Sequence, residues 1–208
     1  GHPYIAYEHG TIRNIPYESN TQGRLCALSY RLSDWTVVTN ADNMSSARRL
    51  GIQNATFVPH PVSEGGIRDV NRDNALRQEL LSKLSANYLV FHPSRQHWSE
   101  DRHPDWEKGN DIFLRGFARF VHNVEKRAAI VLVEWGVSVE DSRVLIERLG
   151  ITDRVIWVPP MPHRRMVEYI QACDLVADQF FLGAFGSTLP KALACGRVSM
   201  LYLNPEIH

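Results

Sequence analysis

Charged residues and glycines directly follow several predicted strands, where parallel α/β folds collect their ligand-binding groups. Arg95 follows a strand predicted over 88–91, and Lys108 precedes the next predicted helix. The free amides at a helix start favour anions, Arg can bind phosphate through two hydrogen bonds, and Lys adds a compact charge. This pair could therefore bind a diphosphate. By themselves, the same residues also fit an ordinary solvated loop before a capped helix.

A second candidate site is the glycine-bearing turn that leads from residue 178 into a predicted helix over 187–195. Gly183 and Gly186 permit close backbone approach, and Ser187 or Thr188 could cap the helix. The turn could hold a phosphate or a sugar, or it could only pack the helix on the sheet. It contains neither G-x-G-x-x-G nor G-K-[ST], so the turn alone is a weak signal.

Glu8 and His9 end a third strand, predicted over 3–7, where His9 could contact a substrate or be structural. Three further histidines share one loop, but no cysteine or H-E-x-x-H motif accompanies them, and we expect no metal site. These histidines are His92, His97 and His103. The chain also lacks the G-x-S-x-G motif of many serine hydrolases.

Strands and helices alternate along the chain, which predicts an α/β fold with parallel sheets covered by helices. One alternating block ends near residue 64 and a longer one begins near residue 73, so the polar segment 63–74 is the predicted linker. In the first block, Leu25, Leu28 and Leu32 form an apolar stripe on a predicted helix, and in the second block one helix is predicted over 163–172.

The composition excludes several classes of protein. The 208 residues carry 23 basic and 23 acidic side chains, which argues against a general nucleic-acid binder. No apolar run reaches the roughly 20 residues of a membrane helix, and no signal peptide is visible. The three widely spaced cysteines indicate free thiols, so we expect a cytoplasmic protein. Apolar strands over 3–7 and 198–203 suggest a piece of a longer chain.

The ordered series of motifs resembles the retaining GT-B glycosyltransferases of family 4 (group 1) over nearly the whole chain. Arg95 and Lys108-Gly109 match the arginine and lysine-glycine that hold the donor diphosphate in that family. The stretch 183–196 matches its E-G-F-G…E-A-M-A-C-G signature in spacing, and weaker matches are 56–62, 150–155 and 159–162.

The resemblance implies the end of an acceptor-side domain over 1–66 and a Rossmann-like donor-binding domain over 67–208. It also implies backbone contacts from Gly183, Ala184, Phe185 and Gly186 to the donor sugar or phosphate, and a tentative catalytic role for His9. The two signature glutamates are replaced by Gly183 and Lys191. Ribose recognition at Lys191 must therefore differ, because a lysine only donates hydrogen bonds. Lys191 could bind phosphate, or it could face solvent.

The resemblance thus implies metal-independent, retaining hexosyl transfer, without a cofactor, from a UDP-, GDP- or ADP-sugar. The acceptor would be a glycan, a lipid-linked glycan or another hydroxyl, as in polysaccharide biosynthesis. The parent protein could lie at the inner face of the membrane, and we expect the 208-residue chain alone to be inactive. The alternatives are a catalytically inactive GT-B-like binding or scaffold protein and, with only Glu8 and His9 in support, a sugar-nucleotide epimerase.

Overall fold

The computed structural model describes residues 2–62, 67, 75–99 and 106–205. The chain divides into two compact units, the first comprising Gly1–Pro61 with Pro205–His208 and the second Val62–Asn204. The predicted linker 63–74, apart from Ile67, lies outside the described residues, as does His103. The division of the chain between residues 66 and 67 and the roles of its two domains stay predictions.

The first unit contains a parallel sheet with strand order β1-β2-β3. Ala6 pairs with Thr36, and Thr36 pairs with Ala55, so all three strands run the same way. Two short 3-10 turns, η1 and η2, follow β1, and two helices connect the later strands. The elements are β1 (Ile5–Tyr7), η1 (Thr11–Arg13), η2 (Ile15–Tyr17), α1 (Thr21–Arg31), β2 (Trp35–Val38), α2 (Asn43–Arg49) and β3 (Ala55–Phe57).

Helix α1 packs against the rest of its unit with its small residues and Tyr30 rather than with its leucines. Leu25, Leu28 and Leu32 are each at least half exposed, whereas Gly23, Ala27 and Tyr30 are buried. Gly23 lets the helix approach η2 closely, because a Cβ at this position would lie 2.3 Å from the carbonyl oxygen of Glu18. The predicted helix is present, but its apolar stripe lies on the exposed side.

The second unit contains a five-stranded parallel sheet with strand order β6-β5-β4-β7-β8. The predicted α/β class with parallel sheets is confirmed in both units. The predicted helix over 163–172 matches α6 at both ends. The elements are α3 (Ala75–Lys83), β4 (Tyr88–His92), α4 (Asn110–Asn123), β5 (Ala128–Val133), α5 (Val139–Arg148), η4 (Thr152–Arg154), β6 (Val155–Val158), α6 (His163–Ala172), β7 (Leu175–Ala177), α7 (Thr188–Ala194) and β8 (Val198–Met200).

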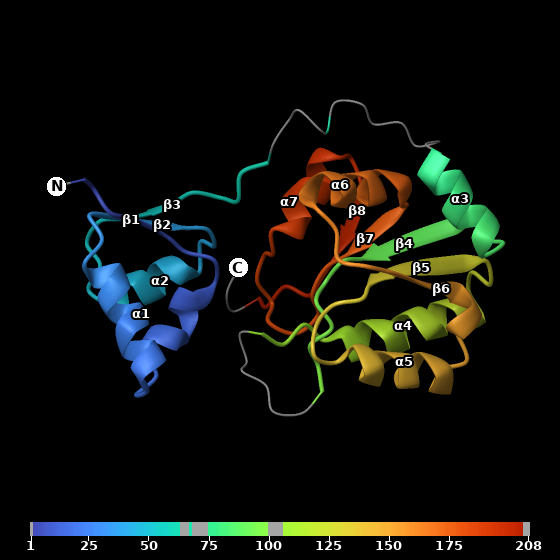
Figure 1. Cartoon of the computed structure of the whole chain (residues 1–208), viewed down its shortest axis with the longest axis horizontal. Coiled ribbons are helices and arrows are strands. Elements are labelled where there is room, and N and C mark those ends of the chain that lie inside the picture. The colour runs from blue at the N-terminus through green and yellow to red at the C-terminus, as the bar shows by residue number, and fades with distance from the viewer. Residues whose placement is uncertain (1, 63–66, 68–74, 100–105, 206–208) are drawn as a thin grey trace. The chain divides into compact units, whose positions relative to one another are not determined.

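Helices cover this sheet on both faces, with α4 and α5 on one side and α6 and α7 on the other (Figure 1). Strand β5 is buried along its whole length, as expected for a central parallel strand between two helical layers. Phe113, Phe117 and Val121 of α4 pack in the core on one face. Val167 and Ile170 of α6 pack in the core on the other.

The chain order reverses at β4. From β4 the chain proceeds through β5 to β6 in one direction, and later through β7 to β8 in the other. Ligands of open α/β sheets bind outside the carboxyl ends of the strands at such a reversal point. The loops after β4 and β7 are therefore the first place to look for a site.

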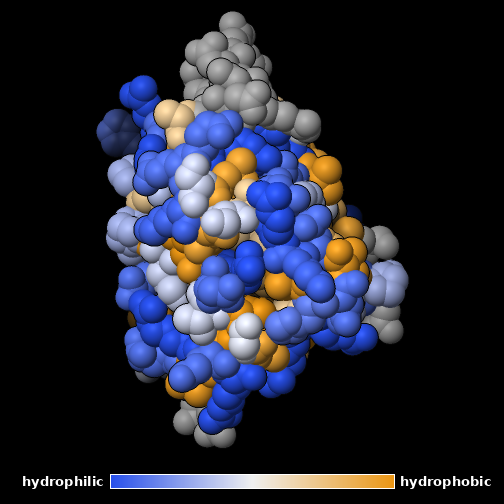
Figure 2. All heavy atoms as spheres, turned by 90° about the vertical axis from the view of Figure 1, so that its right-hand side faces the viewer, coloured by the Kyte–Doolittle hydropathy of each residue, from blue (hydrophilic) through white to orange (hydrophobic). Residues whose placement is uncertain are grey.

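No helix within the described ranges is long and apolar enough to cross a bilayer. Figure 2 shows a face of the molecule that is mostly hydrophilic, with its hydrophobic residues in separate patches. The three cysteines are free, and Cys173 and Cys195 are buried.

Candidate functional site

Three loops of the second unit are joined by hydrogen bonds at the carboxyl ends of β4 and β7. The Ser94 hydroxyl, just after β4, donates to the backbone carbonyl of Asp178 at 3.1 Å and to its Oδ1 at 3.2 Å, just after β7. The Phe180 amide donates to the Lys108 carbonyl at 2.8 Å, which ties the segment before α4 to the same place. Arg95 and Lys108 are thus held by neighbouring backbone segments although they lie 13 positions apart in the sequence.

Arg95 is half-buried on the loop after β4, with its guanidinium carbon 6.0 Å from the centre of the Trp135 ring. The Trp135 indole N–H donates to the Pro93 carbonyl at 3.2 Å, which fixes the ring beside this loop. Nε of Arg95 is buried and has no hydrogen-bond partner among the described residues. A buried donor without a partner is costly, and an anion could satisfy it.

Lys108 is half-buried immediately before α4, and its backbone amide donates to the His97 carbonyl at 2.9 Å. Gly109 begins the helix in the left-handed region, with φ 63°. A Cβ on Gly109 would lie 2.9 Å from the carbonyl carbon of Phe180, so only glycine fits this contact. The Glu107 carboxylate accepts from the Gly109 amide at 3.2 Å, so this amide is already engaged without a ligand.

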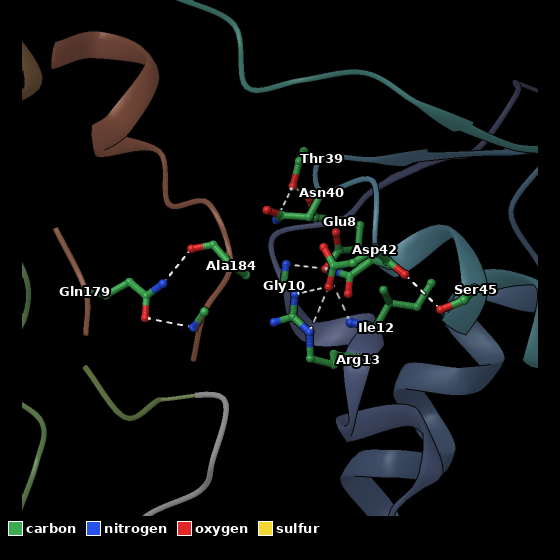
Figure 3. A network of polar contacts seen from close by, with 12 residues as sticks. Glu8, Gly10, Ile12, Arg13, Thr39, Asn40, Asp42, Ser45, Gln179 and Ala184 are labelled. Carbon is green, nitrogen blue, oxygen red and sulfur yellow. Dashed lines mark hydrogen bonds and ion pairs between the residues drawn. The ribbon is translucent and has the colours of Figure 1, made fainter. Parts of the chain in front are cut away.

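The Gln179 side chain forms hydrogen bonds with the backbone at the start of the turn over 183–186 (Figure 3). The Gln179 side chain donates to the Ala184 carbonyl at 2.6 Å, and its oxygen accepts from the Leu182 amide at 2.9 Å and the Gly183 amide at 3.4 Å. The Gly183 amide is therefore engaged within the loop. Ser187 precedes α7 but makes no side-chain cap, contrary to the sequence expectation.

Gly183 has no room for the glutamate that the related signature carries. Its φ is 76°, and a Cβ there would lie 2.6 Å from the Asn204 Cβ. Asn204 donates from its backbone amide to the Gly183 carbonyl at 3.1 Å, so the segment after β8 is fastened against this turn. Ala184 is buried, whereas Phe185 is exposed.

Asp178 and Lys191 are two largely buried residues of opposite charge that interact electrostatically with each other. Asp178 is 6% exposed and Lys191 is 8% exposed, so most of the Lys191 side chain is covered by the protein. Burial raises the pKa of the Asp178 carboxyl, and Lys108 and Lys191 both act in the opposite direction. Burial lowers the pKa of the Lys191 ammonium, and Asp178 opposes this shift.

His92 ends β4 and joins β4, β7 and α4, a role that no sequence pattern indicated. Its Nδ1 donates to the Ala177 carbonyl of β7 at 2.9 Å, and its Nε2 accepts from the Asn110 amide of α4 at 3.0 Å. These two bonds define one neutral tautomer. Burial lowers the pKa of His92 to about 4, and the bond to Ala177 only partly opposes this shift.

Acidification should destabilise the fold through His92. Between pH 6.5 and about 4 the unfolded chain binds a proton that the folded chain excludes, so stability falls as the pH falls through this window. We expect the contribution of His92 to the loss to reach about 3 kcal/mol at pH 4. Urea unfolding at several pH values measures it. His92→Gln should show a shallower pH dependence than the wild type, whereas the exposed-site control His122→Gln should not.

In the first unit, His9 is exposed and Glu8 is fully buried. The His9 ring centre lies 4.7 Å from that of Tyr7 and 6.1 Å from that of His60. Glu8 Oε1 accepts from the backbone amides of Gly10 and Ile12 (Figure 3), so this carboxylate organises the turn after β1. In the described parts of the chain, no cluster of three or more His, Cys, Asp or Glu side chains could hold a metal.

Comparison with known proteins adds relatives with named activities, although no family model matches the chain. D-inositol 3-phosphate glycosyltransferase of Nocardia farcinica (strain IFM 10152) is 35% identical over 95 residues, which are 43% of this chain and 21% of that protein. The protein of the same name from Xylanimonas cellulosilytica is 26% identical over 151 residues, 70% of this chain and 32% of that protein.

Solved structures extend the likeness to both units. The structure of HepE from Anabaena in complex with UDP and glucose matches 96% of this chain and 52% of its own, with a TM-score of 0.68 at 19% identity. The chain has the fold of the GT-B glycosyltransferases. It spans about half of that GT-B structure and smaller parts of the curated relatives.

Proposed function

We propose that this chain carries the nucleotide-sugar site of a glycosyltransferase that moves a hexosyl group to a hydroxyl of an acceptor. The observation that carries the proposal is the joining of the Arg95 and Lys108 segments at the reversal point of a GT-B sheet. The UDP complex of HepE and the named activity of the sequence relatives support it. The donor would be a UDP-, GDP- or ADP-sugar.

The proposed chemistry is metal-independent transfer with retention and without a cofactor. In the transition state the diphosphate leaving group gains negative charge, and stabilising developing charge is a large source of catalysis. Arg95, whose buried Nε has no partner among the described residues, and Lys108, at the start of α4, would supply this stabilisation. The exposed His9 would orient a hydroxyl as a neutral imidazole. The backbone at Ala184, Phe185 and Gly186 would contact the donor sugar or phosphate.

The acceptor is proposed to be a glycan, a lipid-linked glycan or another hydroxyl compound, and not nucleic acid. The equal numbers of basic and acidic residues fit recognition of one diphosphate rather than a polyanion. Such an acceptor fits a cytoplasmic enzyme that can bind peripherally to the inner face of the membrane.

A second candidate is a GT-B-like binding protein without catalysis. It is favoured by Gly183, where the crowded backbone leaves no space for a carboxylate side chain, and by Lys191 at the second signature position. The epimerase alternative has less support, because Glu8 accepts two backbone hydrogen bonds and is buried.

Donor hydrolysis by the whole protein, including any sequence that flanks this chain, tests the proposal without a known acceptor. We expect slow release of nucleoside diphosphate and free sugar from one of the three donor classes, unchanged by EDTA. Proton NMR should show the initial sugar in the anomeric configuration of the donor. Binding without turnover would favour the second candidate, and a changed sugar that remains attached to nucleotide would favour an epimerase.

A further inference from the structure

Lys191 is a largely covered lysine with a counter-ion nearby and, among the described residues, no hydrogen-bond partner. Its residue is 8% exposed, and it lies in α7 facing Asp178 at the carboxyl end of β7. Within the described residues, no hydrogen bond or ion pair within 4 Å is formed by its ammonium. The Lys191 ammonium is not among the fully buried atoms without a partner, so it keeps some contact with solvent, and its three N–H donors remain available to a ligand that brings acceptors.

Asp178 connects Lys191 with the other cations of the site. Its carboxylate interacts electrostatically with both Lys108 and Lys191. Lys108 lies between β4 and α4, and Lys191 lies in α7, between β7 and β8. Ser94, the residue before Arg95, donates to Asp178 Oδ1 at 3.2 Å. Asp178 Oδ2 lies against Gly186 and forms no hydrogen bond of ordinary geometry with a described residue. One carboxylate thus borders the segments that carry all three cations.

The charge of Asp178 has a specific consequence for Lys191. Burial alone favours the neutral amine, and the nearby carboxylate favours the ammonium. A lysine held charged in a poorly solvated place is an effective phosphate ligand, because its attraction to an anion is weakly screened there. Arg95 contributes its Nε, a buried donor without a partner among the described residues, at the same edge of the sheet.

We propose that Lys191 is a third cation of the diphosphate site, with Asp178 as its counter-ion. The inference rests on the proposed nucleotide-sugar site and refines it. At the sequence position where the related signature has a glutamate, Lys191 would contact phosphate oxygens rather than ribose hydroxyls. The donor would then be held by three cations from three segments, and its ribose would be recognised less strictly.

Calorimetric titration of Lys191→Met with UDP, GDP and ADP tests the proposal. Methionine keeps the unbranched shape and removes the charge. For the nucleoside diphosphate that binds the wild type most tightly, we expect the affinity to fall about 10- to 100-fold, the range of a lost hydrogen bond to a charged group. The affinity for the corresponding monophosphate should fall less, and the 2′-deoxy diphosphate should lose the same factor as the parent diphosphate. Lys83→Met, at an exposed position at the end of α3, is the matched control and should bind as the wild type does.

Lys191→Glu separates the phosphate contact from a ribose contact, because the two predict opposite results. A phosphate contact predicts weaker diphosphate binding than in Lys191→Met, whereas a ribose contact predicts binding at least as tight as in the wild type. Thermal unfolding without ligand should show that Lys191→Met remains folded. If Lys191→Met binds within threefold of the wild type, or if Lys191→Glu binds as tightly as the wild type, the inference is wrong while the nucleotide site stands. If the wild type binds none of the three diphosphates, the proposed function itself fails.

Discussion

Replacing Arg95 and Lys108 together by alanine is expected to weaken nucleoside diphosphate binding about 100- to 10,000-fold. Each cation would form charged hydrogen bonds with the diphosphate worth about 1.5–3 kcal/mol, and the two contributions should nearly add. The Arg95 donor is buried and has no hydrogen-bond partner within the described chain, so the wild-type protein does not have to break a bond at Nε to bind the ligand. Isothermal titration calorimetry with the tightest of UDP, GDP and ADP gives the ratio.

A matched control removes the same charge elsewhere in the second unit. Arg115 and Arg119 are exposed on α4, and the double variant Arg115→Ala/Arg119→Ala changes the net charge equally. It should bind within about threefold of the wild type, since exposed charges are largely screened by salt. Equal losses in both double variants would mean that net charge, rather than the placement of Arg95 and Lys108, controls binding.

Gly109→Ala is expected to destabilise the fold by about 2–5 kcal/mol and to disrupt the site. The residue has φ 63°, which costs a non-glycine residue about 1–2 kcal/mol. The added Cβ would also lie 2.9 Å from the Phe180 carbonyl carbon, and overpacking of this kind costs a further 1–3 kcal/mol or so. The clash would push Lys108 away from Phe180, whose amide donates to the Lys108 carbonyl. Urea unfolding and nucleotide titration measure the two effects.

Gly150→Ala separates the cost of the left-handed backbone from the cost of the contact with Phe180. Gly150 has φ 65°, close to that of Gly109, but no heavy atom lies within 4 Å of the place its Cβ would take. Gly150→Ala should therefore be destabilised only by the cost of the left-handed backbone, and its diphosphate binding should be unchanged. Equal destabilisation of the two variants would refute the claim that the Gly109–Phe180 contact positions Lys108.

The sequence predicted the fold well where periodicity was strong and was misleading where packing decided. The helix at 163–172 was predicted at both ends, because its apolar residues repeat with helical spacing. The stripe of Leu25, Leu28 and Leu32 has the same kind of pattern, yet α1 buries Gly23 and Ala27 instead. An apolar stripe shows that a helix is amphipathic, but which neighbour packs against it, and how closely, depends on tertiary structure.

The sequence allowed Arg95 and Lys108 to be proposed as phosphate ligands, but it did not indicate which residues hold their loops in place. Arg95 and Lys108 could be chosen because charged residues followed a strand and preceded a helix. Asp178 also follows a strand, which was a usable signal, but its relation to Lys191, 13 residues later, depends on how α7 returns over the sheet. Gly183 was predicted to admit a ligand, whereas its close contact is with Asn204. Such a contact between segments after different strands has no local sequence pattern.

A single titration tests the central claim that the second unit binds the diphosphate of a nucleotide sugar. The wild-type chain is titrated with UDP, GDP and ADP by calorimetry, without metal ions and with EDTA present. The account predicts saturable one-to-one binding of at least one of the three, and its loss in Arg95→Ala/Lys108→Ala while that variant remains folded. No binding of any of the three by folded wild-type protein, or undiminished binding by the double variant, would contradict it.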